Sequence, residues 1–162
     1  MRLTLQQCRD RLAAARHAVL ATVTPDGWPH AVPIVFALAE GELVTAVDGK
    51  PKTTTDLQRL RNIAARPRVA VLAERYDEDW SRLWWVRVDA VAEVVPAGRA
   101  DAASGLALLA GRYPQYGGVP PAGPLIICRT LAWTGWAAAP PDGPGDGVRP
   151  GGWAGRVGRV TG

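Results

Sequence analysis

Three short apolar runs separated by two strong turn signals constrain the fold more than any other feature of the sequence. The first run, residues 18–24, is followed by Pro25-Asp26-Gly27, in which proline presets φ and glycine permits a positive φ. Residues 28–37 form the return run, and Glu40-Gly41-Glu42 then precedes a third run at 43–47. This order predicts an antiparallel meander of three strands.

The rest of the sequence adds three strands and three helices to this meander. Pro29 and Pro33 interrupt the return run, so that strand is expected at a sheet edge or with a bulge. Thr4 and Gln7 form a capping box at the start of the first helix. The helices are expected at residues 4–16, after the Thr53–Asp56 capping pattern with an end before Pro67, and at 99–112. The further strands are expected at 69–73, 83–95 and 125–136.

This order of elements contains no alternating βαβ pattern, which argues against a parallel doubly wound sheet. A closed or nearly closed antiparallel barrel is the natural arrangement, because closure removes the exposed sheet edges. The predicted fold class is therefore mainly β with flanking helices, with six antiparallel strands. Residues 1–139 are expected to form one domain. Residues 140–162 are rich in glycine and proline and are expected to be a disordered tail.

Charge and composition exclude several classes of partner. The net charge is +4, but the basic residues are spread along the chain and form no familiar nucleic-acid-binding signature, so no nucleic-acid partner is expected. No apolar run approaches membrane-spanning length, and the N-terminus has no secretory pattern. We therefore expect a cytoplasmic protein without membrane contact. Cys8 and Cys128 are expected to be reduced packing residues.

The distribution of lysine indicates an anion site. The chain has 19 basic residues, and its only lysines are Lys50 and Lys52, on either side of Pro51. They are followed by Thr53 and two further threonines, at the predicted start of a helix. Ammonium groups, hydroxyl donors and the positive end of a helix dipole favour a phosphate or polycarboxylate there. The alternative is a well-capped surface loop.

Residues for acid–base, nucleophilic or metal chemistry are not evident. His17, His30 and the two cysteines lack zinc-ligand spacing, and neither serine lies in a nucleophile elbow. No metal site is expected, and the catalytic residues stay unassigned. An anion site without a catalytic constellation is typical of an enzyme whose cofactor carries the chemistry.

The order and spacing of three segments resemble the pyridoxamine-phosphate-oxidase-like split barrels. Residues 18–36 resemble the first hairpin of that family, and residues 47–53 with 61–71 resemble its cofactor-tail segment. The run at 76–88 is similar to an actinobacterial subgroup that depends on a deazaflavin, coenzyme F420. The resemblance covers roughly residues 1–138.

The resemblance implies a homodimeric, six-stranded split barrel of the FMN-binding type, with two cofactor sites at the subunit interface. It implies that Lys50 and Lys52, assisted by Thr53, hold the phosphate or oligoglutamate tail. It also implies that the stretch of Ala31, Val32, Pro33 and Ile34 lines one face of the ring, and that Trp85 and Arg87 close the pocket. Asn62 is taken as a structural residue.

The function that the resemblance implies is hydride transfer between coenzyme F420 and a small unsaturated or aromatic substrate. Three alternatives stay open. The first is an FMN-dependent oxidase or reductase of the same fold, because lysine in place of a family arginine leaves the anion unspecified. The second is a carrier of the deazaflavin that catalyses nothing. The third is a heme protein, in which axial ligation would fall to His17 or His30.

Overall fold

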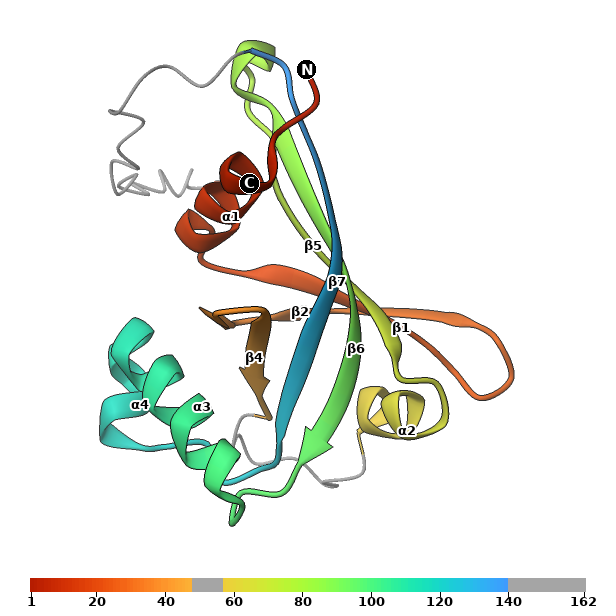
Figure 1. Cartoon of the computed structure of the whole chain (residues 1–162), viewed down its shortest axis with the longest axis vertical. Coiled ribbons are helices and arrows are strands. Elements are labelled where there is room, and N and C mark those ends of the chain that lie inside the picture. The colour runs from red at the N-terminus through yellow and green to blue at the C-terminus, as the bar shows by residue number, and fades with distance from the viewer. Residues whose placement is uncertain (48–56, 140–162) are drawn as a thin grey trace, which may run out of the picture.

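The computed structural model describes residues 1–47 and 57–139. Figure 1 shows a long twisted sheet with helices packed against its ends and one side. The elements in chain order are α1 (Leu5–Ala14), β1 (Ala18–Val23), β2 (Pro29–Ile34), β3 (Ala37–Ala39), β4 (Glu42–Ala46), α2 (Gln58–Ala65), β5 (Arg68–Arg75), a short 3-10 helix (Trp80–Arg82), β6 (Trp84–Val95), α3 (Ala100–Arg112), α4 (Pro114–Gly118) and β7 (Leu125–Ala137).

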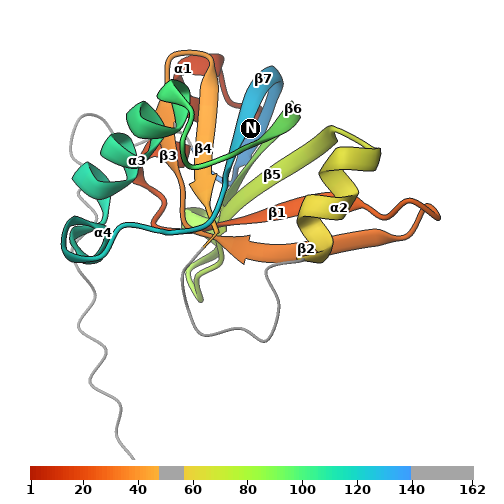
Figure 2. The same cartoon turned by 90° about the horizontal axis from the view of Figure 1, so that it is seen from below.

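The strands form one antiparallel sheet in the order β2-β1-β5-β6-β7-β4-β3. The sheet has seven strands rather than the predicted six, because the predicted return strand at 28–37 is interrupted at Val35 and Phe36. Its two parts, β2 and β3, occupy opposite edges of the sheet. Only two residues join these edges, so the sheet must curl back on itself, as Figure 2 shows. This is the split-barrel arrangement that the sequence predicts.

The corner between β2 and β3 is held by Tyr113, which follows α3. The Tyr113 hydroxyl lies 2.9 Å from the carbonyl oxygen of Phe36 and 3.0 Å from that of Arg16, and it accepts a 3.2 Å hydrogen bond from the Phe36 amide. Both Phe36 and Tyr113 are buried. The hydroxyl therefore satisfies the polar backbone groups that the interrupted strand leaves unpaired.

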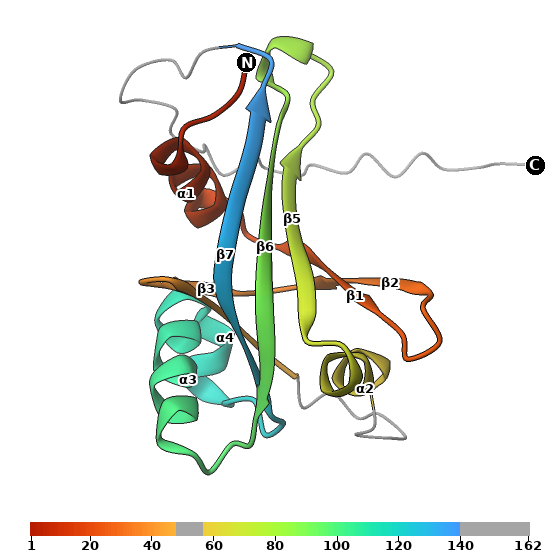
Figure 3. The same cartoon turned by 45° about the vertical axis from the view of Figure 1, so that its right-hand side comes forward.

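The helices pack against both faces of the sheet and against its end near the start of β5. Figure 3 shows α1 and α3 beside β6 and β7, with α2 below β5. Cys8 and Leu12 of α1 belong to the core cluster that contains Leu43, whereas α3 packs on the cluster that contains Val44, the next residue of β4, whose side chain points to the opposite face. The capping box of α1 is confirmed: Thr4 Oγ1 accepts from the Gln7 amide, and Gln7 Oε1 accepts from the Thr4 amide. The main apolar core lies on the face of the sheet that α1 and α2 cover, and a smaller cluster lies under α3 on the other face. None of the helices in the described residues is long and apolar enough to span a membrane.

The structure differs from the predicted local structure at two places. The helix after the threonine run begins only at Gln58, with Leu57 at its N-cap position, and the Thr53–Asp56 pattern itself lies outside the described residues. The predicted loop at 113–124 contains the short helix α4, which begins at Pro114, because proline is suited to the first turn of a helix. The predicted tail at 140–162 lies outside the described residues.

Candidate functional site

The predicted ring-lining stretch forms most of β2, at one edge of the sheet. Side chains alternate along a strand, so the stretch divides between the two faces. Ala31 and Pro33 are exposed on the outer face, whereas Ile34 is buried in the core and Val32 packs against it. Only Ala31 and Pro33 of the four predicted residues can therefore contact a ligand on the outer face.

Arg87 belongs to the same face and to the same row of the sheet as Pro33. Pro33 pairs with Val19 of β1, and Val19 pairs with Leu72 of β5. Leu72 pairs in turn with Arg87 of β6. The pairing register thus places two residues that are 54 positions apart in sequence on one line across four strands. The structure brings this pair of predicted site residues together.

Trp85 lies on the outer face as well, two residues before Arg87, but beyond the part of the sheet that β1 and β2 reach. It pairs with Glu74 of β5 and with Trp136 of β7. Within one chain it is therefore separated from the β2 residues. Lys50, Lys52 and Thr53 lie outside the described residues.

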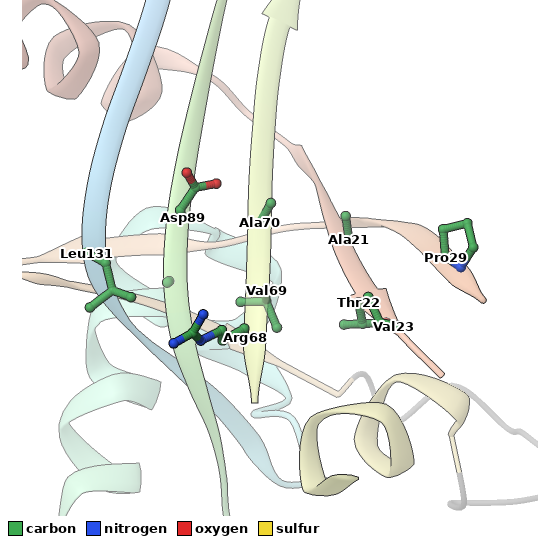
Figure 4. A pocket seen from close by; sticks show the side chains of 10 residues that line it. Ala21, Thr22, Val23, Pro29, Arg68, Val69, Ala70, Asp89 and Leu131 are labelled. Atoms are coloured by element: carbon green, nitrogen blue, oxygen red, sulfur yellow. The ribbon is translucent and has the colours of Figure 1, made fainter. Parts of the chain in front are cut away.

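A second row, next to the first, is made almost entirely of alanine. Ala31 of β2 pairs with Ala21 of β1, and Ala21 pairs with Ala70 of β5. Ala70 pairs with Asp89 of β6, which pairs with Ala132 of β7. Small side chains between two rows of larger ones leave a trough across the strands. Figure 4 shows Ala21, Ala70 and Asp89 in line on three neighbouring strands.

The trough is part of a groove of about 530 Å³ on the outer face. Its walls are mostly apolar, and its charged members are the Arg68 guanidinium and the Asp89 carboxylate (Figure 4). The lining residues are Ala21, Thr22, Val23, Pro29, Arg68, Val69, Ala70, Asp89, Ala90 and Leu131. Sequence reasoning missed this groove, because the alanines gather only through strand pairing, which a single sequence does not reveal.

An ion pair on β6 joins the two rows, because Arg87 belongs to the row of Pro33 and Asp89 belongs to the alanine row. Arg87 Nε lies 3.1 Å from Asp89 Oδ1, and a second guanidinium nitrogen lies 3.2 Å from Asp89 Oδ2. About half of the Arg87 side chain is exposed. The pair therefore presents an oriented cation at the edge of an apolar groove. An elongated planar ligand with an electron-rich edge fits this combination.

Two other predicted features have simpler roles. Cys8 and Cys128 are buried and unpaired in a disulfide, and burial raises the pKa of the Cys128 thiol to about 12. They are packing residues, as the sequence predicts. Within residues 1–47 and 57–139, no three His, Cys, Asp or Glu side chains come together as metal ligands.

The comparison with protein families decides how this fold is classified. The pattern described as "Pyridoxamine 5'-phosphate oxidase" matches residues 4–131. The chain belongs to this family. The resemblance of residues 1–138 to the family is thereby confirmed, whereas no match identifies the deazaflavin subgroup.

Solved structures of other proteins share the fold of this chain. A conserved hypothetical protein of Mycobacterium tuberculosis, Rv2991, is 23% identical with a TM-score of 0.67, over 84% of this chain and 86% of that one. A FAD-binding protein of Mesorhizobium loti is 20% identical with a TM-score of 0.64, over 83% and 95%. The heme storage protein HutZ of Vibrio cholerae is 14% identical with a TM-score of 0.64, over 82% and 93%. No curated protein sequence matches the chain.

Proposed function

We propose that this member of the pyridoxamine 5'-phosphate oxidase family is a cytoplasmic, homodimeric oxidoreductase that uses coenzyme F420. Its substrate is a small unsaturated or aromatic molecule. When bound, the deazaflavin supplies the hydride donor or acceptor. The chain itself has to bind the ring, hold the anionic tail and orient the substrate.

The observation that carries this proposal is the pair of cross-strand rows on the outer face. One row aligns Pro33 with Arg87, and the other row is the alanine trough beside it. Two strand spacings, from β2 to β5, amount to about 10 Å, which suits the length of three fused six-membered rings. Larger side chains at Ala21 or Ala70 would fill the space that the ring needs.

Arg87 is the candidate for stabilising negative charge that develops on the substrate or ring during hydride transfer. A guanidinium held by a carboxylate is already oriented, so little reorganisation is needed as charge develops. Asp89 supplies that orientation through its two contacts with Arg87. The proton that accompanies the hydride is assigned to solvent.

The anionic tail is assigned to Lys50, Lys52 and Thr53. The two ammonium groups would provide the charge attraction, which makes the tail interaction dependent on salt concentration.

A second copy of the chain is the proposed cover of the outer face. Val23, Leu72 and Leu131 are large apolar residues that remain exposed there, at 36%, 37% and 65%. Apolar residues that are gathered on one sheet face indicate an interface rather than isolated surface residues. A partner docked on this face would enclose the groove and bring its own Trp85 and Arg87 near the ligand, which matches the implied interface site.

FMN is the second candidate cofactor, because the same groove and the same anion site suit its ring and its phosphate. The FAD-binding relative of the same fold adds to this alternative. A carrier without catalysis is the third candidate, since Asp89, the carboxylate that lines the groove, is engaged by Arg87.

A fluorescence titration tests the proposal. The purified protein is titrated separately with coenzyme F420 and with FMN, and tryptophan quenching and coenzyme emission are followed together. Micromolar F420 binding with much weaker FMN binding supports the proposal, and the reverse preference makes the chain a flavin protein. Bound F420 that reduces no enone, nitroaromatic or quinone in a test panel indicates a carrier.

A further inference from the structure

The ion pair on β6 lies across the direction of the groove. Arg87 and Asp89 are two positions apart on one strand, so the line that joins their side chains runs along β6. The alanine row runs across the strands, from Ala21 through Ala70 to Asp89 (Figure 4). A planar ligand that lies in the trough from β1 toward β6 therefore meets the flank of the ion pair, where its end faces a cation and a carboxylate together.

Both members of the ion pair keep hydrogen-bonding capacity. Arg87 uses Nε and Nη2 to hold the two carboxylate oxygens of Asp89, at 3.1 and 3.2 Å. A guanidinium has five N–H donors, so three are left, and each carboxylate oxygen has a second lone pair. Neither side chain has another hydrogen-bond or ion-pair partner within residues 1–47 and 57–139. The pair thus presents a donor and an acceptor side by side.

The other ion pairs in the described part of the chain belong to larger networks. The Arg99 guanidinium binds the carboxylates of both Glu93 and Asp101. The Asp77 carboxylate is contacted by Arg75 and by Arg82. The pair on β6 has two members and borders the groove, so its remaining donors and acceptors are available to a ligand there.

The charges of the pair restrict the chemistry of the ligand's end. A simple anion is attracted by Arg87 but repelled by Asp89, and a simple cation meets the reverse. An apolar end would remove water from both charges and supply no hydrogen bond in return. A neutral end that accepts from the guanidinium and donates to the carboxylate gains two charge-assisted hydrogen bonds. A cyclic imide, –CO–NH–CO–, is such an end, and it fits either way round because a carbonyl flanks the N–H on both sides.

We propose that the Arg87–Asp89 pair recognises the imide edge of a planar heterocycle. The guanidinium donates to a ring carbonyl, and the carboxylate accepts from the ring N–H. The ligand class is a flat, largely apolar ring system that ends in a cyclic imide, which includes both flavins and deazaflavins. Asp89 is then a ligand-binding residue as well as the group that orients Arg87. The assignment rests on the proposed position of the ring in the groove, but it requires neither F420 in particular nor any contact with an anionic tail.

The rest of the groove suits the body of such a ligand. The two rows are about 7 Å apart along the strands, roughly the width of a six-membered ring with two carbonyl oxygens, so one ring can reach members of both rows. Ala21 and Ala70 leave room beneath the ring system, and the lining is mostly apolar. The polar end of the ligand therefore faces the ion pair while its apolar part covers the alanines.

The test compares two tail-free flavins that differ at the imide nitrogen. Lumiflavin carries its single N–H there, and 3-methyllumiflavin carries a methyl group in its place. Each is titrated with the full-length protein, and the change in flavin fluorescence gives the dissociation constant. We expect the wild type to bind lumiflavin at least about tenfold more tightly than 3-methyllumiflavin, because the methylated ring cannot donate to the carboxylate.

Asp89→Ala and Asp101→Ala assign this preference to one carboxylate. Asp101 also pairs with an arginine two positions away, and its side chain is exposed to a similar degree, 40% against 42% for Asp89. We expect the ratio of the two dissociation constants to fall below about twofold in Asp89→Ala and to stay at the wild-type value in Asp101→Ala. A general loss of stability would weaken the binding of both flavins alike and leave the ratio unchanged.

Three results would overturn the inference. They are equal affinity of the wild type for the two flavins, no binding of lumiflavin up to its solubility limit, and an unchanged ratio in a folded Asp89→Ala protein. The proposed function fails in a different way. A wild type that discriminates between the flavins but does not bind coenzyme F420 keeps the imide site and loses the F420 assignment. F420 binding without discrimination between the flavins removes the imide site alone.

Discussion

Arg87 Nε and Asp89 Oδ1 lie 3.1 Å apart on the outer face of β6. Asp89 belongs to the alanine trough, and Arg87 belongs to the neighbouring row that leads to Pro33. Both side chains are partly exposed, so the pair contributes no more than about 1 kcal/mol to the stability of the fold. Its position indicates a role in orienting a cation rather than in stability.

Arg87→Ala is therefore predicted to slow hydride transfer with little effect on folding. Loss of an oriented charge should lower the rate of transfer at least about tenfold. The measurement is the absorbance change of reduced F420 mixed with menadione as the probe acceptor. Asp89→Asn should give a smaller loss of the same kind, because it leaves the guanidinium present but unoriented. Equal rates in all three proteins would remove Arg87 from the site.

Gly135 of β7 is predicted to tolerate no side chain. A Cβ at this position would lie 2.7 Å from Cys8 Sγ and 2.9 Å from a Leu3 methyl carbon, so α1 and the N-terminal residues would have to move away from the sheet. Gly135→Ala should cost about 1–3 kcal/mol in a urea denaturation experiment.

Gly111→Ala is the matched control for that variant. Nothing lies within 4 Å of a Cβ at Gly111 in α3, and alanine favours the helix. The control should stabilise the protein by about 0.5–1 kcal/mol. A Gly135→Ala protein as stable as the wild type would show that the contact between α1 and β7 is looser than described.

The buried thiol of Cys128 should make the free energy of unfolding depend on pH in alkaline solution. Burial raises the pKa of its thiol from 9.0 to about 12. The unfolded chain releases this proton above pH 9, whereas the folded chain keeps it. The contribution of the protonated Cys128 thiol to the free energy of unfolding is therefore complete below pH 9 and is lost as the pH rises toward 12. The loss should approach about 1.4 kcal/mol per pH unit in that window.

Cys128→Ala provides the comparison for this prediction. Urea denaturation of both proteins between pH 8 and pH 10.5 should give a steeper decline for the wild type. Parallel declines would mean that Cys128 is less shielded from water than the structure indicates. The wild-type thiol should also resist iodoacetamide at pH 8 until the protein is unfolded.

Tyr113→Phe should destabilise the corner between β2 and β3. The variant removes a hydroxyl that bonds both the amide and the carbonyl of Phe36, and leaves the buried amide unpaired. The expected loss is about 1–3 kcal/mol, measured by urea denaturation. Tyr76→Phe, at a tyrosine whose side chain is exposed, serves as the control. A Tyr113→Phe variant that is no less stable than this control would contradict the role of the hydroxyl.

Local patterns in the sequence predicted most of the fold. The turns at Gly27 and Gly41 have the positive φ angles of +98° and +74° that their turn signals require, and the capping box at Thr4 is formed. The break at Val35 and Phe36 was missed, because these two apolar residues carry no turn signal and Tyr113, which holds the corner, is distant in sequence.

The candidate site was predictable only in part, since it depends on which strands become neighbours. Pro33 and Arg87 were identified separately by resemblance, but the line that joins them exists only through Val19 and Leu72. Asn62 looked like an ordinary polar residue on a helix. Its bond to Thr22 depends on tertiary packing, which no local pattern encodes.

The most direct test of the account is the affinity of Ala70→Trp for coenzyme F420, compared with the wild type and with Ala103→Trp on the exposed side of α3. Ala70 is in the middle of the alanine trough, whereas Ala103 is far from it in the fold. Light scattering shows whether each variant keeps the oligomeric state of the wild type. We predict that Ala70→Trp weakens F420 binding at least about tenfold and that Ala103→Trp binds as the wild type does. A folded Ala70→Trp protein with unchanged affinity would contradict the assignment of the outer-face groove as the coenzyme site.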